Sequence, residues 1–294
     1  MFTANHLTSM RRRSRIATGL GSIAVVGLLL LILNRVPVPR TGERSEDRGA
    51  AAGHRSREVE VMDADIVVAW RDEPDHFTRL RRRMLNEDIA GRDVTDETVL
   101  RAMGKVPRQE FVPDDSRDAA YQDHPLPVGE GQTISQPYIV ALMTQLAGAR
   151  RGCRALDVGT GSGYQAAVLA EICDEVCSIE IVEPLARQAT ARLAALGYPN
   201  VVVRYGDGYR GWPDKAPFDV IIVAAAPDHV PKPLVEQLAK GGRLVIPVGR
   251  SYQELLVIER DQQGELHQHP GIRVRFVPMT GEAEEPERQA GRSR

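Results

Sequence analysis

Leu156-Asp157-Val158-Gly159-Thr160-Gly161-Ser162-Gly163-Tyr164 is the stretch that decides the fold of this chain. An apolar run ends in a glycine-rich turn, and a helical apolar pattern follows it. This order is typical of the first strand, turn and helix of an open parallel sheet, where glycines let the backbone approach a ligand and the helix-start amides face it. The dinucleotide fingerprint requires a third small residue where Tyr164 stands, so an NAD-dependent oxidoreductase is a weaker interpretation.

Strand and helix patterns alternate through the residues after this turn. The apolar runs that indicate buried strands are 154–158, 177–182, 200–205, 218–226 and 242–248. Helical patterns lie between them at 164–172, 184–196 and 231–240. The alternation predicts an α/β fold with a doubly wound, Rossmann-like parallel sheet and helices on both faces. Two more apolar runs, 255–259 and 274–279, follow short connections, which predicts an antiparallel C-terminal finish.

A helical subdomain is predicted before the glycine-rich turn. The apolar face of its first helix is formed by Leu80, Met84, Leu85 and Ile89. Thr95 or Asp96 could cap a second helix, and Ser135 could cap a third one that begins near Pro137. A region rich in proline and glycine, residues 106–131, separates the second helix from the third.

Acidic residues stand at the ends of the first three predicted strands. Glu180 ends the second strand, where a carboxylate can accept hydrogen bonds from both hydroxyls of an adenosine ribose. Asp207 follows the third strand and could bond an adenine amino group, and Asp157 could accept from a ligand's ammonium or steady the loop. Because the carboxyl ends of parallel strands share one edge of the sheet, the three acids predict one adenosine-sized pocket.

Composition excludes several classes of protein. The formal net charge of -2 argues against a protein held on nucleic acid by bulk charge, and the mean hydropathy of -0.29 excludes a polytopic membrane protein. The cysteines, Cys153, Cys173 and Cys177, are too few for a disulfide framework, so we expect three small core residues, as suits a reducing compartment. We predict no metal site, since these cysteines lack a nearby histidine and His267-x-His269 lacks an acidic partner.

Further motifs resemble those of the protein-L-isoaspartate (D-aspartate) O-methyltransferases, from about Arg83 to Thr280. The two most specific segments are Gln132-Thr133-Ile134-Ser135-Gln136-Pro137, preceded by Gly129-Glu130-Gly131, and Phe276-Val277-Pro278-Met279-Thr280. The others are 106–113, 206–208 and 241–249. The glycine-rich loop itself is common to most S-adenosylmethionine-dependent methyltransferases.

The resemblance implies a repair enzyme with S-adenosyl-L-methionine as its cofactor. Such an enzyme methylates the α-carboxylate of L-isoaspartyl and D-aspartyl residues in damaged proteins or peptides, and the ester then cyclises to a succinimide. Ser135 is the implied active-site residue. The candidate cofactor contacts are Thr133, Ile134, Asp157, Gly159, Gly161, Glu180, Asp207, Gly208 and Thr280. A carboxylate is ionised at neutral pH and needs no general base, so we expect Ser135 to orient the substrate rather than to attack it.

Three alternatives remain open at this point. Ser135 could be no more than a helix cap. The enzyme could be an S-adenosylmethionine-dependent carboxyl methyltransferase for another substrate, since the glycine-rich loop fits both. A membrane-tethered module that binds adenosyl ligands without turnover would also carry this loop, although an intact Ser135 and intact acids speak against it.

The N-terminal residues predict a membrane anchor and a tether. Residues 16–33 contain no charge, and a helix of this length would span about 27 Å. We therefore divide the chain into a basic segment with an anchor (1–35), a polar tether (36–76), a methyltransferase domain (77–281) and a disordered tail (282–294). Arginines flank the anchor on both sides, so charge does not fix its orientation. We expect a catalytic domain in the cytoplasm, where S-adenosylmethionine is made, with the periplasmic side as the alternative; translation from Met62 or Met84 would remove the anchor.

Overall fold

The computed structural model describes residues 75–284. The predicted anchor, residues 36–74 of the predicted tether and the part of the tail after residue 284 lie outside the described residues, whereas Asp75 and His76 begin a helix. Within residues 75–284, no helix is both long enough and apolar enough to cross a membrane.

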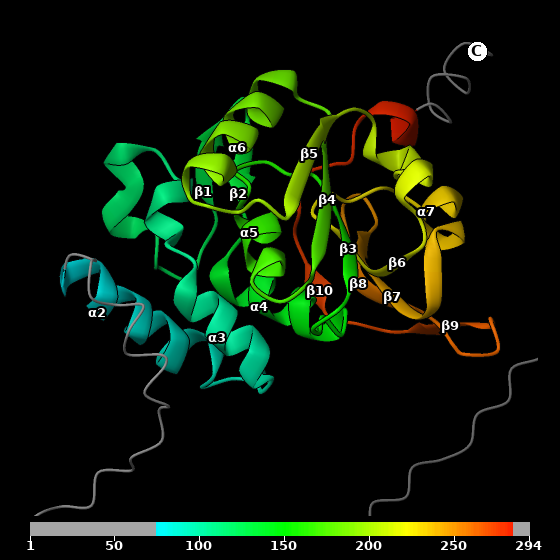
Figure 1. The fold of residues 1–294 in the computed structure, drawn as a ribbon, viewed down its shortest axis with the longest axis horizontal. Helices are drawn as coiled ribbons and strands as arrows, with labels where there is room; N and C mark the ends of the chain where they lie inside the picture. Colours follow the sequence, from blue (N-terminus) through cyan, green and yellow to red (C-terminus); the bar gives the residue numbers. More distant parts are fainter. Residues whose placement is uncertain (1–74, 285–294) are drawn as a thin grey trace, which may run out of the picture. The chain divides into compact units, whose positions relative to one another are not determined.

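A central sheet of eight strands forms the core of the described residues (Figure 1). Its order is β10-β8-β7-β6-β3-β4-β5, and β9 pairs with β8. The parallel strands are β3 (Arg154–Val158), β4 (Glu175–Glu180), β5 (Val201–Tyr205), β6 (Phe218–Val223) and β7 (Leu238–Val248). The chain runs outward from β3 to β5 and then crosses to β6 on the other side of β3. The sheet is therefore doubly wound, as predicted.

Helices cover both faces of this sheet. In Figure 1, α4 (Pro137–Leu146), α5 (Tyr164–Ala170) and α6 (Glu183–Ala195) lie on one side and α7 (Lys232–Glu236) on the other. Alternate residues of β6 face the two cores: Val220 and Ile222 pack beneath the first group, and Ile221 and Val223 beneath α7. The predicted helix 231–240 ends early, because Leu238 already belongs to β7 and pairs there with Phe218 of β6.

The C-terminal finish is antiparallel, as predicted. Strand β8 (Gln253–Arg260) pairs antiparallel with β7, β9 (Leu266–His269) and β10 (Arg273–Val274). The predicted strand 274–279 is wrong beyond Val274. Pro278 has no N–H to donate to a ladder, and this segment instead makes an isolated parallel bridge to Ala226 after the end of β6.

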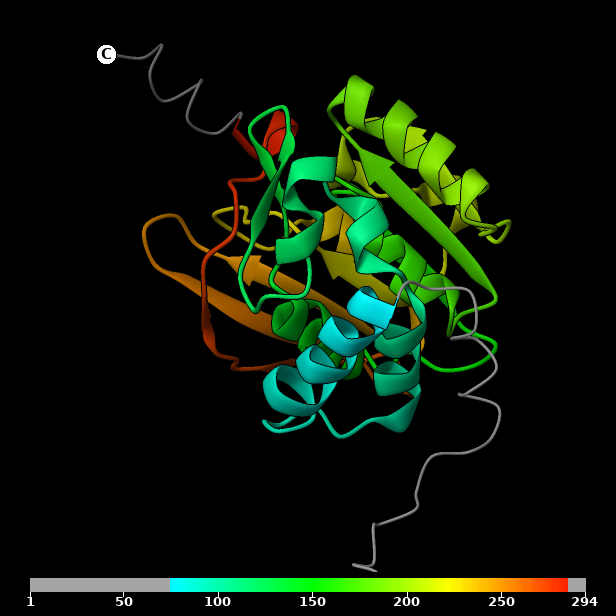
Figure 2. The ribbon, with the colours of Figure 1, turned by 90° about the vertical axis from the view of Figure 1, so that its left-hand side faces the viewer.

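The N-terminal part of the described chain is helical. Helix α2 (Asp75–Arg83) continues as a π-helical turn, η1 (Met84–Ile89), and α3 (Glu97–Lys105) follows. Asp96 caps α3, since its Oδ1 accepts the Thr98 N–H at 2.8 Å. In Figure 2 these segments are cyan; α3 packs on α4 and α5, and η1 packs on α4. Two short 3₁₀ helices, η2 (Arg108–Phe111) and η3 (Asp114–Ala119), and the hairpin of β1 (Leu126–Gly129) and β2 (Gln132–Ile134) lead to α4.

The start of α4 differs from the prediction that Ser135 caps it. The helix begins at Pro137, and Gln136 is its N-terminal flanking residue without a side-chain cap. Asp123, which lies fifteen residues before Tyr138, caps the helix instead, because its Oδ1 accepts the Tyr138 N–H at 3.1 Å. The interpretation of Ser135 as a helix cap is therefore wrong.

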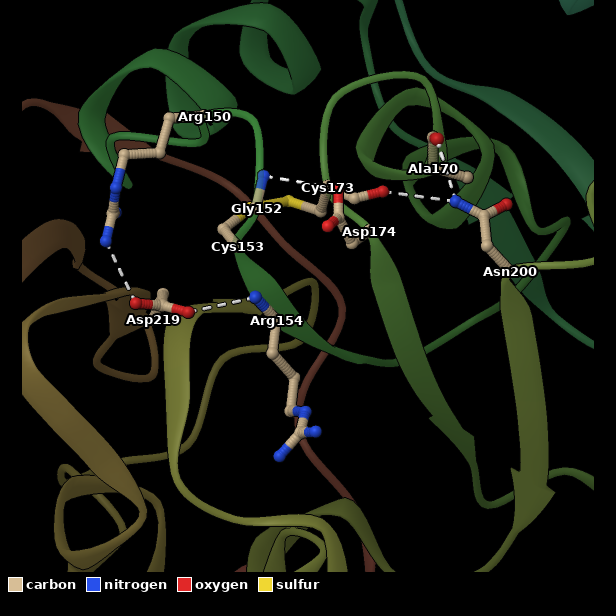
Figure 3. The surroundings of a disulfide bond; sticks show 9 residues. All are labelled: Arg150, Gly152, Cys153, Arg154, Ala170, Cys173, Asp174, Asn200 and Asp219. Atoms are coloured by element: carbon tan, nitrogen blue, oxygen red, sulfur yellow. Dashed lines mark hydrogen bonds and ion pairs between the residues drawn. A yellow bond between two sulfur atoms is a disulfide. The ribbon is translucent and has the colours of Figure 1, made fainter.

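Two of the three cysteines also differ from the prediction. Cys153 and Cys173 form a disulfide (Figure 3). Cys177 is a buried free thiol in β4. The bond joins the start of β3 to the turn after α5, because one strand and one helix bring the chain back to the same edge of the sheet. Asn200 donates to the carbonyls of Ala170 and Cys173 at 2.9 and 3.1 Å and so holds this turn. All three cysteines are buried, as expected, but the expectation that none of them forms a disulfide is wrong.

Two smaller expectations also need correction. His267 has an acidic partner, since its Nε2 lies 2.7 Å from Asp261 Oδ2 in the turn between β8 and β9. Residues 282–284, predicted as the start of the tail, belong to a 3₁₀ turn, η6 (Gly281–Glu284). The Glu282 N–H donates to Asp207 at 2.8 Å, and the Glu282 carboxylate pairs with Arg210, so this turn is tied to the end of β5.

Candidate functional site

A pocket opens at the carboxyl ends of β3, β4 and β6, where the winding direction of the sheet reverses. It encloses about 830 Å³, counting its open mouth. The predicted site residues that line it are Thr133, Ile134, Ser135, Gly159, Gly161, Glu180, Gly208 and Thr280. The point of reversal is where open α/β sheets bind ligands.

The glycine-rich loop forms the floor between β3 and α5. Gly161 has a φ of 52°, a conformation that glycine adopts without strain, and its N–H donates to Glu180 Oε2 at 2.7 Å. Helix α5 begins directly after this loop, at Tyr164. Residues 159–162 and Tyr164 therefore line the pocket where the strand passes into the helix.

Glu180 lies in the pocket at the end of β4 and is 5% exposed. Its Oε1 accepts the Val182 N–H at 2.9 Å, so each carboxylate oxygen already accepts one backbone hydrogen bond. A carboxylate has about four acceptor positions, so two remain for a vicinal diol. The structure thus gives Glu180 a second task that the sequence does not reveal, which is to fix the glycine-rich loop.

The other two predicted acids do not line the pocket. Asp157 is fully buried beneath the loop, where its Oδ2 accepts from Ser178 Oγ at 2.7 Å. Burial raises the pKa of Asp157 to about 7; the Ser178 hydrogen bond opposes this shift and the charge of Glu180 adds to it. Ser178 Oγ also lies 2.5 Å from Thr160 Oγ1, so Asp157 steadies the loop from below.

Asp207 shapes the wall beside the adjoining glycine. Its Oδ1 accepts the Tyr209 N–H at 2.9 Å and its Oδ2 accepts from Glu282. Gly208 lines the pocket in its place, and a Cβ at this position would lie 2.4 Å from Val158 Cγ1. The close approach explains why glycine stands at the end of this turn.

The Ser135 segment forms the opposite wall. Ser135 is half-buried, and within the described part of the chain its hydroxyl has no hydrogen-bond partner. Because it has no partner there, the hydroxyl of Ser135 is available to a substrate.

Thr280 lines the same pocket. The Met279 N–H donates to the Ala226 carbonyl at 2.9 Å, beyond the end of β6, and so brings Thr280 to this place.

Two charged residues behind this wall were not predicted as part of the site. Arg108 donates to the Ser135 carbonyl at 2.7 Å, and Asp123 accepts from Gln136 Nε2 at 2.6 Å. A lone arginine between Val106 and Phe111 is the only trace of this arrangement in the sequence. Asp123 carries no such signal, since acids are common in loops.

The residues present fit S-adenosylmethionine. A buried acid with free acceptor positions suits a ribose, the glycine-rich loop admits a ligand close to the backbone, and a polar mouth at Thr133 and Ser135 leaves room for a second substrate. No cluster of three or more histidine, cysteine or acidic side chains that could hold a metal ion occurs in residues 75–284.

Comparisons with known proteins identify the family of the chain. The family model described as "Protein-L-isoaspartate(D-aspartate) O-methyltransferase (PCMT)" matches residues 79–284. A protein-L-isoaspartate O-methyltransferase of Opitutus terrae is 58% identical over 206 residues, which cover 70% of this chain and 88% of the relative. A second relative, from Polaromonas sp., is 53% identical over 71% of this chain and 99% of its own length.

Two solved structures show the same fold. A protein-L-isoaspartate O-methyltransferase superposes with a TM-score of 0.64 at 29% identity, over 72% of this chain and 69% of the other. A Plasmodium falciparum protein, described as a putative protein-L-isoaspartate O-methyltransferase in complex with S-adenosyl-L-homocysteine, has a TM-score of 0.60 at 25% identity, over 70% of this chain and 99% of its own. The chain therefore belongs to the protein-L-isoaspartate(D-aspartate) O-methyltransferase family.

Proposed function

We infer that this chain transfers a methyl group from S-adenosyl-L-methionine to the α-carboxylate of L-isoaspartyl and D-aspartyl residues in damaged proteins or peptides. The ester then cyclises to a succinimide, whose hydrolysis returns some normal aspartate. The observation that carries this inference is that Ser135, which the family resemblance implies as the active-site residue, shares one pocket with Glu180 and the glycine-rich loop. Family membership over residues 79–284 supports it.

The residues of the pocket align the two substrates. S-adenosylmethionine, when bound, supplies a methyl group on a positively charged sulfur that leaves as a neutral thioether. The substrate carboxylate is ionised at neutral pH, so no residue has to remove a proton. Ser135 donates a hydrogen bond to one carboxylate oxygen and directs the other toward the methyl carbon. Glu180 would accept hydrogen bonds from the ribose hydroxyls, and the apolar residues of the pocket would exclude water that would disturb an in-line transfer.

A matched pair of peptides tests the reaction class. Peptides that differ only in an isoaspartyl or a normal aspartyl residue should differ in methyl incorporation, and only the isoaspartyl one should be a substrate. Equal rates would instead favour a carboxyl methyltransferase for another substrate. Cofactor binding without turnover of either peptide would favour the binding module.

The role of Ser135 has its own test. Ser135→Ala should lower turnover by about 10²-fold, because a misplacement of about 1 Å can cost that much in an aligned transfer. The affinity for S-adenosylmethionine should stay within a few-fold of wild type. Since α4 does not use Ser135 as a cap, the melting midpoint should not change. Turnover close to that of wild type would remove Ser135 from the reaction.

We also propose an anchor in residues 1–35, a tether in 36–74 and a catalytic domain in 75–284, with the domain bounds moved outward because α2 begins at Asp75 and η6 ends at Glu284. We propose that this domain faces the cytoplasm, because the reaction consumes S-adenosylmethionine, which is made there. One observation opposes this placement, since disulfides such as Cys153–Cys173 persist mainly in oxidising compartments. Reporter fusions at the C-terminus decide between the two sides, and a clear periplasmic signal would overturn the proposal.

A further inference from the structure

Arg108 is a buried cation behind the pocket wall. Its side chain is 0% exposed, and within residues 75–284 its Nη1 has no hydrogen-bond partner. Its Nε donates to the Ala120 carbonyl at 2.6 Å and its Nη2 to the Ser135 carbonyl at 2.7 Å. Burial lowers the pKa of Arg108, yet an arginine stays charged in proteins. A buried charge held by two carbonyls destabilises a fold more than an apolar side chain would, so stability alone explains this residue poorly.

The contacts of Arg108 join the two walls of the pocket. The carbonyl that it holds belongs to Ser135, and its guanidinium carbon lies 4.6 Å from the centre of the Tyr164 ring. Tyr164 is the first residue of α5 and lines the same pocket directly after the glycine-rich loop. Arg108 therefore contacts both the Ser135 segment and the helix that follows the glycine-rich loop.

Asp123 holds the same segment from its other end. Its Oδ2 accepts from Gln136 Nε2 at 2.6 Å, and its Oδ1 accepts the Tyr138 N–H at 3.1 Å. Residues 135–138 are thus fixed at the Ser135 carbonyl by a cation and at the start of α4 by an anion. Neither Arg108 nor Asp123 lines the pocket.

We propose that Arg108 and Asp123 are positioning residues for methyl transfer, which fix the Ser135 hydroxyl relative to the cofactor loop. The proposal rests on the proposed role of Ser135. The planar fork of arginine reaches two carbonyls while it stacks on a ring, and the single ammonium of lysine cannot reproduce this geometry. Arg108→Lys should therefore keep the charge but release the segment.

Arg81 provides a matched control. It is also buried, at 2% exposed, and its guanidinium lies 5.5 Å from the centre of the Tyr121 ring. Its Nε donates to Tyr121 Oη at 2.9 Å and its Nη1 to the Gly104 carbonyl at 3.3 Å. Tyr121 and Gly104 lie outside the pocket lining. Arg81→Lys should therefore lower stability without changing turnover of the folded enzyme.

The test compares these variants by turnover of an isoaspartyl peptide, cofactor affinity and melting midpoint. Arg108→Lys should lower kcat by roughly 10-fold or more and leave the Kd for S-adenosylmethionine within about threefold. In the Ser135→Ala background, where the oriented hydroxyl is already absent, the same substitution should lower kcat by less than about threefold, because the two residues act as a unit. Arg81→Lys should keep kcat within about twofold of wild type while its midpoint falls.

The outcomes separate the two proposals. If Ser135→Ala retains wild-type turnover, the role of Ser135 fails and the positioning proposal fails with it. If Ser135→Ala loses turnover but Arg108→Lys does not, or if their losses multiply in the double variant, only the positioning proposal is overturned. If Arg108→Lys does not fold, Asp123→Asn replaces it in the test, because Asp123 is only half-buried. An unchanged kcat in Asp123→Asn would overturn the proposal. A loss of kcat that disappears in the Ser135→Ala background would support it.

Discussion

Asp157→Asn tests the electrostatics of the loop floor. Asp157 is fully buried, and its Oδ1 has no partner among the described residues, while its Oδ2 accepts only from Ser178. Burial raises the pKa of this carboxyl from 3.8 to about 7 in the folded chain. Asparagine has the same shape and keeps a carbonyl for the Ser178 hydroxyl, but it does not ionise. The substitution therefore removes the titration and leaves the packing.

The magnitude follows from the two pKa values. The folded state binds this proton more tightly than the unfolded state, so the free energy of unfolding falls as the pH rises from about 4 to about 7. The full shift corresponds to about 4 kcal/mol as an upper bound. Between pH 5 and pH 8.5, the wild type should lose about 2.7 kcal/mol relative to Asp157→Asn, which has no such group, because pH 5 lies two units below the folded pKa. The free energy of unfolding of the variant should therefore increase relative to that of the wild type as the pH rises.

Urea unfolding of both proteins, without cofactor, at the two pH values measures this difference directly. Ser178→Ala provides a second variant with the opposite sign, because the Ser178 hydrogen bond lowers the pKa of Asp157. Its loss should extend the decline in stability to higher pH. A difference between wild type and Asp157→Asn that stays constant within about 0.5 kcal/mol would refute the reasoning, since it would mean that the carboxyl is already ionised in the folded state at pH 5 and that its pKa is not raised.

Two further predictions concern the cofactor and the disulfide. Glu180→Gln should weaken S-adenosylmethionine binding by roughly 1.5–3 kcal/mol in an equilibrium titration, the usual loss for hydrogen bonds to a charged group, and unchanged affinity in a folded variant would remove Glu180 from the cofactor site. The double variant Cys153→Ala/Cys173→Ala opens a loop with a sequence separation of 20 residues and should lose about 2–4 kcal/mol of unfolding free energy. Wild type in reductant should unfold like this variant; identical stability of all three samples would show that the bond does not constrain the chain.

Local patterns predicted the sheet and its ligand edge, because strand period and glycine turns are properties of neighbouring residues. They failed where the direction of a side chain, or a partner far away in the sequence, determines the role of a residue. Asp157 and Glu180 both stand at strand ends, yet only Glu180 lines the pocket. The amide of Tyr138 bonds Asp123, fifteen residues earlier, so no local signal could show that Ser135 is not the cap. The Cys153–Cys173 pair is visible only once the β3–α5 unit returns the chain to its starting edge.

The two walls of the pocket are fixed in different ways, one by backbone conformation and the other by side-chain hydrogen bonds. The glycine-rich loop takes its shape from backbone freedom, as at Gly161, so many unrelated substrates can be served by the same few glycines. The Ser135 segment is held through side chains supplied from elsewhere, with Arg108 at one end and Asp123 at the other. A wall fixed in this way keeps its geometry only if several particular residues are present together. That dependence explains why the glycine-rich loop indicates only a methyltransferase, whereas the Ser135 segment indicates the family.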